Sequence, residues 1–366
     1  MAGIFDYLKW RGDILMSAVP LTDADRLILS ELSYIDFGNE EPKPLAQLCT
    51  EMLHKIEVIR KSGARMKLLH HKQDEELMRV LSQSPRFREL MIGHCESRIS
   101  REREEQFAAM TVYLPDNSAA CVFRGTDWSL VGWKEDFNMS YCEALPAQLS
   151  AVRYLARIGA VHGGELRVMG HSKGGNLAVY AAAFAPADIA SRVVDITSLD
   201  GPGFCEVVMD SPEYAAIADK VRTFMPKASI VGVLFSRTGR FTVIESRASG
   251  VMQHIPYNWE IMGAGFITAS EQDGSSQLVE DTLNDWIRTM TPKERKKFID
   301  TVWSVLADLK IDEFYELLDG KNARAIIKNY AALDEEARTL IGETLAKLRT
   351  CAKASLRELI SAGRGK

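Results

Sequence analysis

The stretch that decides the fold is "ELRVMGHSKGGNLAVYAAAFA", residues 165–185. The apolar run at its start predicts a strand, and the alanine-rich run that follows predicts a helix. Between them Gly170, Ser172 and Gly174 fit the pattern G-x-S-x-G, in which a serine occupies a sharp strand-to-helix turn that exposes its hydroxyl. Small residues on both sides let the strand and the helix converge. We therefore predict that Ser172 is a nucleophile; the alternative is a plain turn with an incidental serine.

Strand and helix patterns alternate on both sides of this turn. Before it, residues 106–127, "QFAAMTVYLPDNSAACVFRGTD", predict two strands joined by a hairpin connection at 115–118. After it, three further strands are predicted in "RVVDITSLD", "KVRTFMP" and "RFTVIES". This alternation is typical of an α/β domain with a mostly parallel sheet, and the hairpin implies an antiparallel edge. With the serine turn, it predicts the α/β-hydrolase fold.

Both ends of the chain have helical patterns. Residues 21–37 offer Thr22 as an N-cap, the stretch "SPRFRELMI" (84–92) is a further short helix candidate, and the charge run at 96–106 indicates a boundary. Near the other end, Thr291 and Glu294 form a capping box. We expect a helical N-terminal segment (1–104) packed on the core, a hydrolase core (105–286) and a helical C-terminal extension (287–366). The extension packs on the core or on a second copy of the chain.

Composition excludes several classes of protein. The 366 residues carry a net charge of −5, so no basic excess exists to neutralise the phosphates of a nucleic acid. No run of about 18 apolar residues predicts a transmembrane segment, and the first residues show no signal-peptide pattern. The six cysteines are scattered, which favours reduced thiols over a disulfide framework or a zinc site. We expect a cytoplasmic protein with no metal, no cofactor and no nucleic-acid partner.

One histidine follows Ser172 in the chain. In α/β-hydrolases the order is nucleophile, acid, then base, so His254, in "SGVMQHIPYNWEI", is the predicted base. An ordinary loop histidine is the alternative. We expect His171 to pack beneath the nucleophile, and we assign no role to His70 and His71.

The acid is harder to select. Asp200 follows the strand "VVDITSL" and begins a Gly-Pro-Gly turn, where a carboxylate could hold the tautomer of the imidazole. Glu245 is the reserve, and Asp200 could also be a turn former only. For the oxyanion we expect two backbone donors, the N–H of Lys173, directly after the serine, and the N–H of Thr126, in the loop that follows "CVF".

Three pieces of sequence in this order resemble the class 3 (fungal-type) triacylglycerol lipases. They are "VFRGTD" followed by Trp133 and Asp136, then "GHSKGG", then "QHIPYNWEI", and the likeness covers about residues 105–262. With its helical head and tail, the whole chain is similar to a bacterial branch of lipase-like proteins. The family's acid usually follows the next strand, where this chain has Ser229. However, "ITSLDGPGF" is similar to the segment in pancreatic-type lipases that carries the acid, which supports Asp200.

Together these residues predict a lipase- or esterase-like serine hydrolase with a Ser-His-Asp catalytic triad. It would cleave a small-molecule or lipid ester through an acyl-enzyme on Ser172. Apolar residues after Asp200, at 204, 207–209 and 230–235, suggest an apolar acyl group. The alternatives are a hydrolase-fold protein that binds a partner or acyl ligand without turnover, and a thioesterase or amidase with the same triad.

Overall fold

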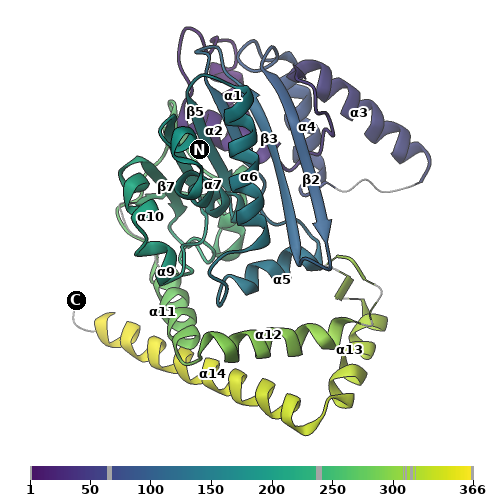
Figure 1. Ribbon diagram of the computed structural model, residues 1–366, viewed down its shortest axis with the longest axis vertical. Helices are drawn as coiled ribbons and strands as arrows, with labels where there is room; N and C mark the ends of the chain where they lie inside the picture. The colour runs from purple at the N-terminus through teal and green to yellow at the C-terminus, as the bar shows by residue number, and fades with distance from the viewer. Residues whose placement is uncertain are drawn as a thin grey trace.

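The computed structural model describes residues 2–63, 68–235, 241–307, 309, 311–313, 316–317 and 319–363. Within them the central sheet has eight strands in chain order (Figure 1). Neighbours from β1 to β4 are antiparallel, and those from β4 to β8 are parallel. The strands are β1 (Lys43–Pro44), β2 (Met91–Ser100), β3 (Glu105–Tyr113), β4 (Ala119–Phe123), β5 (Leu166–His171), β6 (Val193–Leu199), β7 (Val221–Pro226) and β8 (Phe241–Ile244). A mostly parallel sheet with an antiparallel edge is confirmed.

Helices cover both faces of the sheet. One face packs against α1 (Ile4–Arg11), α2 (Asp23–Leu32), α3 (Leu45–Lys61) and α4 (His71–Gln83). The other packs against α6 (Pro146–Val161) and α7 (Lys173–Phe184), with the short α8 (Ala187–Ala190), α9 (Glu206–Met209) and α10 (Pro212–Ile217) nearby. The central strands β4, β5 and β6 are buried on both faces, and the apolar residues that predominate in them made them recognisable from sequence.

The N-terminal segment is not wholly helical, which corrects the prediction for residues 84–104. The stretch 84–92 forms turns and the start of β2, and the charge run continues β2 into its hairpin with β3. The reason is tertiary: Arg98 of β2 lies opposite β3 and donates hydrogen bonds to the buried Glu105. The expected boundary at 104 therefore falls in the connection of a hairpin. Thr22 does cap α2, accepting from the backbone of Asp25.

The C-terminal helices form an arm beside the core. They are α11 (Gly274–Arg288), α12 (Pro292–Ala307), α13 (Gly320–Ala332) and α14 (Glu335–Gly363). Figure 1 shows α12 and α14 side by side below α5 (Leu130–Asn138), the helix that follows the carboxyl end of β4. The expected boundary at 286 falls within α11, and residues 364–366 of the predicted extension lie outside the described part. We retain the three-part division as a proposal with these limits. No helix of the described residues combines the length and the apolar character needed to cross a membrane.

Candidate active site

Ser172 lies between the last residue of β5 and the first residue of α7. Its backbone has φ 58° and ψ −133°, a conformation that residues other than glycine rarely adopt. Strand and helix approach so closely that a Cβ on Gly170 would lie 2.3 Å from the carbonyl carbon of Gly174. A Cβ on Gly174 would lie 2.1 Å from the carbonyl oxygen of Phe123. The two glycines of the motif are therefore sterically required, and Ser172 is held at a strained turn.

The structure brings the predicted base and acid together. Nδ1 of His254, at the end of the 3₁₀ helix η2 (Gly250–His254), donates to Oδ2 of Asp200 at 2.7 Å. The Asp200 side chain is fully buried, and that of His254 is 22% exposed. Glu245, the reserve acid, instead forms an ion pair with Lys227 at 2.9 Å. No hydrogen bond joins the Ser172 hydroxyl to His254 in the described residues, and contacts of this kind often tighten only when substrate binds.

Ser229 stands where the resembled family carries its acid, and it contacts Asp200, the predicted acid. Its hydroxyl donates to Oδ1 of Asp200 at 2.5 Å and accepts from the backbone N–H of Gly232 at 2.8 Å. The amide of Gly232 orients the Ser229 hydroxyl toward Oδ1 of Asp200, and His254 donates to Oδ2. Both carboxylate oxygens of Asp200 therefore have a donor. Sequence comparison marked Ser229 as a departure from the family but did not reveal this contact.

His171 is buried beside the base and makes two hydrogen bonds. One ring nitrogen, Nε2, lies 2.8 Å from the backbone carbonyl oxygen of His254, and the other, Nδ1, lies 3.0 Å from the hydroxyl of Tyr34. A carbonyl oxygen only accepts, so Nε2 carries the proton, and burial lowers the pKa of His171 well below its usual value. The neutral ring then accepts from Tyr34. His171 thus holds the backbone of His254, the predicted base, and Tyr34 holds His171; the sequence did not indicate this contact of Tyr34.

The predicted oxyanion donors lie on two loops that meet at the serine. A Cβ on Gly125 would lie 2.6 Å from the carbonyl oxygen of His171 and 3.0 Å from Cβ of Ser172, so the loop carrying Thr126 lies against the turn. The hydroxyl of Thr126 donates to Asp136 at 2.6 Å, and burial raises the pKa of Asp136 to about 6. Among the described residues, the backbone N–H groups of Thr126 and Lys173 have no hydrogen-bond partner. Two unpaired donors therefore adjoin Ser172.

The side chain of Lys173 is buried, which the motif alone did not predict. Its ammonium donates to the backbone carbonyl of Gln106 and to the carboxylate of Glu135, both at 2.9 Å. Glu135 in turn accepts from the backbone N–H groups of Gln106 and Ala147. This buried ion pair connects the first turn of α7 to β3 and α5. A charged residue between glycines in an apolar setting was the available signal, because a buried cation needs a counter-ion.

The structure does not assign an acyl pocket to the predicted apolar residues. Phe204, Val208 and Met209 belong to the core between the sheet and its helices, and Val207 is exposed. The described residues contain no group of three or more His, Cys, Asp or Glu side chains arranged to hold a metal ion. All six cysteines are free thiols.

Comparisons with known proteins give one family model and several solved structures. A family model described as Mbeg1-like matches residues 81–304. The comparison with curated proteins gives no match. Similar solved structures include the native Rhizomucor miehei lipase propeptide complex, with 13% identity over 65% of this chain and 81% of that chain and a TM-score of 0.36. The M37 lipase has 13% identity over 59% and 70% with a TM-score of 0.35. A triacylglycerol lipase from Penicillium expansum has 12% identity over 51% and 78% with a TM-score of 0.32.

Identities this low carry no information about residue roles or substrate. The described chain itself has a mostly parallel sheet, helices on both faces and a serine on the strained turn after β5. It has the α/β-hydrolase fold predicted from the sequence.

Proposed function

The chain belongs to the Mbeg1-like family, and we propose that it is a lipase- or esterase-like serine hydrolase that cleaves carboxylic esters. The observation that carries the proposal is the 2.7 Å hydrogen bond between His254 and the buried Asp200, beside the strained turn of Ser172. A structural turn does not need a histidine and a carboxylate paired at its mouth.

In the proposed reaction His254 accepts the proton of the Ser172 hydroxyl through Nε2 while Oγ attacks the carbonyl carbon of the ester. The backbone N–H groups of Thr126 and Lys173 hold the negative charge on the carbonyl oxygen. The tetrahedral intermediate collapses, His254 gives its proton to the departing alcohol, and an acyl-enzyme remains. Water then attacks the acyl carbon, His254 accepts its proton and returns it to Ser172 Oγ, and the carboxylic acid leaves.

Asp200 is the proposed acid of this triad. Its hydrogen bond to Nδ1 keeps the Nε2 side of the imidazole available for the serine and stabilises the imidazolium that forms. Ser229 supports the carboxylate from its other oxygen. We keep a small-molecule or lipid ester as the proposed substrate. The six free thiols favour a reducing compartment, so we also keep the cytoplasm as the proposed location.

A fluorophosphonate probe tests the nucleophile directly, because it forms a covalent bond with an activated serine. We expect the folded protein to be labelled and Ser172→Ala to lose all labelling. Ser30→Ala is the matched control, because Ser30 is a buried serine on α2 whose hydroxyl has no hydrogen-bond partner among the residues that the structure describes. Folded wild-type protein that stays unlabelled would contradict the proposal and favour a hydrolase-fold protein that binds an acyl ligand without turnover.

A graded series of p-nitrophenyl esters and acyl thioesters then identifies the substrate class. We expect turnover of esters that Ser172→Ala and His254→Ala both abolish. Faster turnover of thioesters than of esters of equal chain length would assign the protein as a thioesterase.

A further inference from the structure

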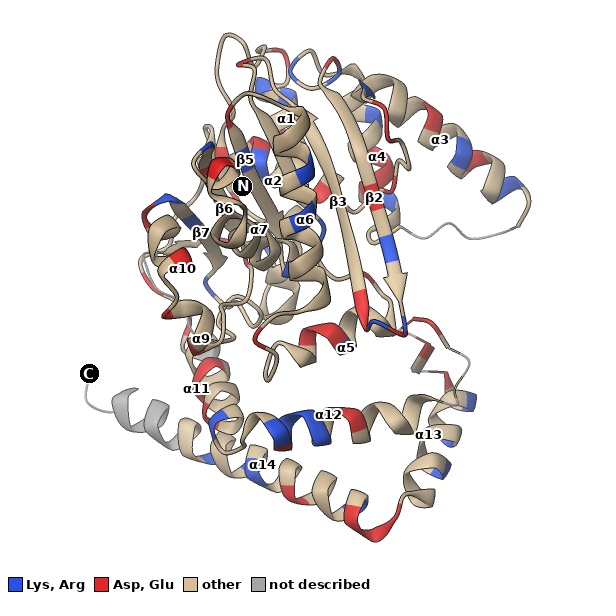
Figure 2. Cartoon of the chain, viewed as in Figure 1, with Lys and Arg blue, Asp and Glu red and all other residues tan. Residues whose placement is uncertain are grey.

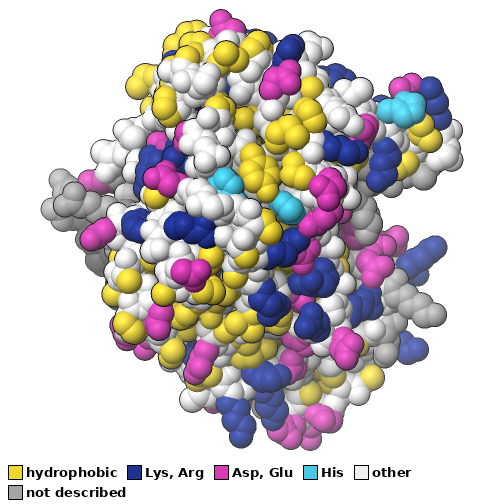
Figure 3. Space-filling model, turned by 45° about the horizontal axis from the view of Figure 1, so that its top comes forward, with side chains coloured by type: hydrophobic (Ala, Val, Ile, Leu, Met, Phe, Trp, Pro, Cys, Tyr) yellow, Lys and Arg dark blue, Asp and Glu magenta, His cyan; other side chains and the backbone are white. Residues whose placement is uncertain are grey.

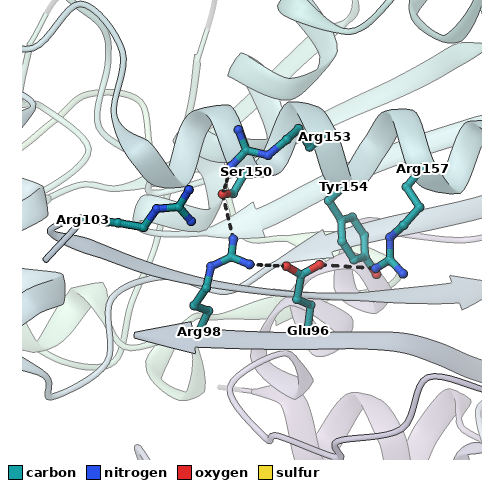
Figure 4. A pocket seen from close by; sticks show the side chains of 7 residues that line it. All are labelled: Glu96, Arg98, Arg103, Ser150, Arg153, Tyr154 and Arg157. Carbon is teal, nitrogen blue, oxygen red and sulfur yellow. Dashed lines mark hydrogen bonds and ion pairs between the residues drawn. The ribbon is translucent and has the colours of Figure 1, made fainter. Parts of the chain in front are cut away.

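A polar hollow lies between β2 and α6 and is lined by residues other than those of the candidate active site. Its volume is about 280 Å³, and four arginines line it together with Glu96 and Ser150. Arg98 comes from β2, Arg103 from the turn that follows, and Arg153 and Arg157 from α6. Figure 2 shows basic residues on both elements, and Figure 3 shows Lys and Arg side chains gathered on this face. Figure 4 shows the side chains of Arg98, Arg103 and Arg153 grouped around Ser150.

The carboxylates around the hollow neutralise two of these arginines. Arg98 donates to Glu105 and to Glu96, and pairing with Glu105 raises the pKa of Arg98. Arg157 donates to Glu40 at 2.7 Å and to Glu96 at 3.4 Å. Arg98 and Arg157 are therefore the two arginines of the hollow whose charge is already balanced by carboxylates.

The other two arginines keep unused donors. Among the described residues, the side chain of Arg153 has one hydrogen-bond partner, the hydroxyl of Ser150 at 2.6 Å. Arg103 reaches one carboxylate, Glu105, at 3.5 Å. Each guanidinium has five N–H donors, so most of the donors of Arg103 and Arg153 are free to bind an anion.

Buried groups behind the hollow hold it in shape. Ser150 is 3% exposed and Glu105 is 1% exposed, and the hydroxyl of Ser150 donates to Glu105 while accepting from Arg98 and Arg153. The ring of Tyr154 lies under Arg157, with 5.2 Å from the guanidinium carbon to the ring centre. Arg98 and Arg157 are therefore held in place before any ligand arrives, which lowers the entropic cost of binding.

We propose that this hollow binds a phosphate group, either free phosphate or the phosphate of a phosphomonoester. A carboxylate is saturated by the fork of one arginine, whereas a tetrahedral dianion offers oxygens to guanidinium groups that arrive from three directions. Arg103 and Arg153, which keep free donors, and Arg98 beside Ser150 line the hollow from the turn, from α6 and from β2. A volume of about 280 Å³ also leaves room for an organic group on the phosphate.

The test compares Arg103→Gln/Arg153→Gln with Arg88→Gln/Arg288→Gln in the full chain. The control removes the same charge from two exposed arginines that pair with neighbouring carboxylates elsewhere. Binding of inorganic phosphate is measured by titration calorimetry, with phosphate replacing chloride so that the ionic strength stays constant. Nonspecific electrostatic attraction is then screened equally in all samples. A second arm measures co-sedimentation with phosphatidylcholine vesicles that contain or lack phosphatidic acid.

We expect the wild type and the control to bind phosphate, and the site variant to bind at least about tenfold more weakly. Binding to phosphatidic acid vesicles without binding of free phosphate, again lost in the site variant alone, would identify the source as a lipid headgroup. Equal binding by the site variant and the control, or no binding of either probe by the wild type, would overturn the proposal. Arg103→Gln alone keeps the test interpretable if the double variant misfolds, because Arg103 is exposed and makes one long ion pair.

Discussion

Ser172 and Asp200 share an uncommon backbone conformation. Their φ angles are 58° and 52°, in a region that costs a residue other than glycine about 1–3 kcal/mol. Backbone hydrogen bonds hold both residues in place. The N–H of Ser172 donates to the carbonyl oxygen of Leu199, and the N–H of Asp200 donates to the carbonyl oxygen of Phe224. The neighbouring strands therefore hold both the hydroxyl and the carboxylate at the carboxyl ends of β5 and β6.

At this residue scale, Asp200→Asn tests the proposed acid. The amide cannot stabilise the imidazolium and favours the wrong tautomer, so we expect kcat for a p-nitrophenyl ester to fall about 10⁴-fold. Ser229→Ala removes one hydrogen bond to the carboxylate and should lower kcat about tenfold. Glu245→Gln is the matched control and should leave kcat unchanged. Full activity in Asp200→Asn would mean that the acid lies elsewhere, with Glu245 the next residue to examine.

His171 predicts a pH dependence of stability. Burial lowers its pKa in the folded protein, so as pH falls below 6.5 the unfolded chain binds a proton that the folded protein does not. The free energy of unfolding should lose about 1.4 kcal/mol per pH unit from this one group. His171→Gln, whose amide can still donate to His254, should lack this contribution. Urea unfolding between pH 8 and pH 5 measures it, because the imidazole of an unfolded chain titrates within about this range.

The exposed His54 supplies the control for that measurement. His54→Gln should keep the wild-type dependence on pH. An unchanged dependence in His171→Gln would show that the buried imidazole is protonated in the folded protein.

At the scale of elements, the start of α7 is held by polar contacts inside an apolar core. The Lys173–Glu135 pair joins α7 to α5, and Asn176 of α7 accepts from Gln148 of α6 at 2.8 Å. Asn176 also donates to the backbone carbonyl of Gly203 at 2.9 Å, in the turn after Asp200. The orientation of α7 and of the turn after Asp200 thus depends on partners from separate elements.

Replacing Lys173 tests how much the ion pair between α7 and α5 contributes to stability. Lys173→Met leaves the carboxylate of Glu135 buried without its partner, so we expect the free energy of unfolding to fall by about 3–5 kcal/mol. Lys173→Met/Glu135→Gln removes both charges and should recover most of that loss in urea unfolding.

An exposed ion pair gives the comparison. Lys297 pairs with Glu336 where the side chains are 55% and 77% exposed, so Lys297→Met should destabilise the protein far less than Lys173→Met does. Equal losses for the two lysine variants would contradict a special role for burial.

At the scale of the whole molecule, both terminal segments are bound to the core. Arg26 of α2 forms a buried ion pair with Asp195 of β6. At the other end, Ser276 of α11 donates to the backbone carbonyl of Ser229 at 2.5 Å. Helix α11 therefore supports the loop that carries Ser229, although α11 begins at Gly274 and the strand before that loop, β7, ends at Pro226. The remaining helices contact the core mainly through α5 and a small cluster of Leu130, Leu309 and Ile311.

Two truncations separate these contributions. A chain of residues 1–290 keeps α11 and loses the small cluster on α5, so we expect it to fold, to be about 2 kcal/mol less stable and to be labelled by the fluorophosphonate probe. A chain of residues 1–272 also loses the support of Ser229, and its labelling rate should fall by at least about tenfold. Circular dichroism checks that both fold, and equal labelling of the two chains would show that α11 does not support the site.

The sequence by itself determined the parallel part of the fold and narrowed the candidate site. Strands β4 to β6 are largely buried, and β4 to β8 are all short stretches rich in apolar and β-branched residues, so they were recognisable from local pattern alone. The motif around Ser172 demands glycines for steric reasons, and the order of the chain left His254 as the one histidine able to follow it. Asp200 was selected because it follows a strand at the same edge. These choices depend on residues close in the chain or on their order.

The tertiary structure alone decided the features that join distant residues. Strand β2 has no clear apolar alternation, and it is a strand because Arg98 and its neighbours pair with β3. The tether from Tyr34 through His171 to His254, the donor role of Ser229 and the counter-ion of Lys173 all join separate elements. Local periodicity reports which face of an element is buried. It does not report which polar groups meet there, because that depends on how the elements pack against one another.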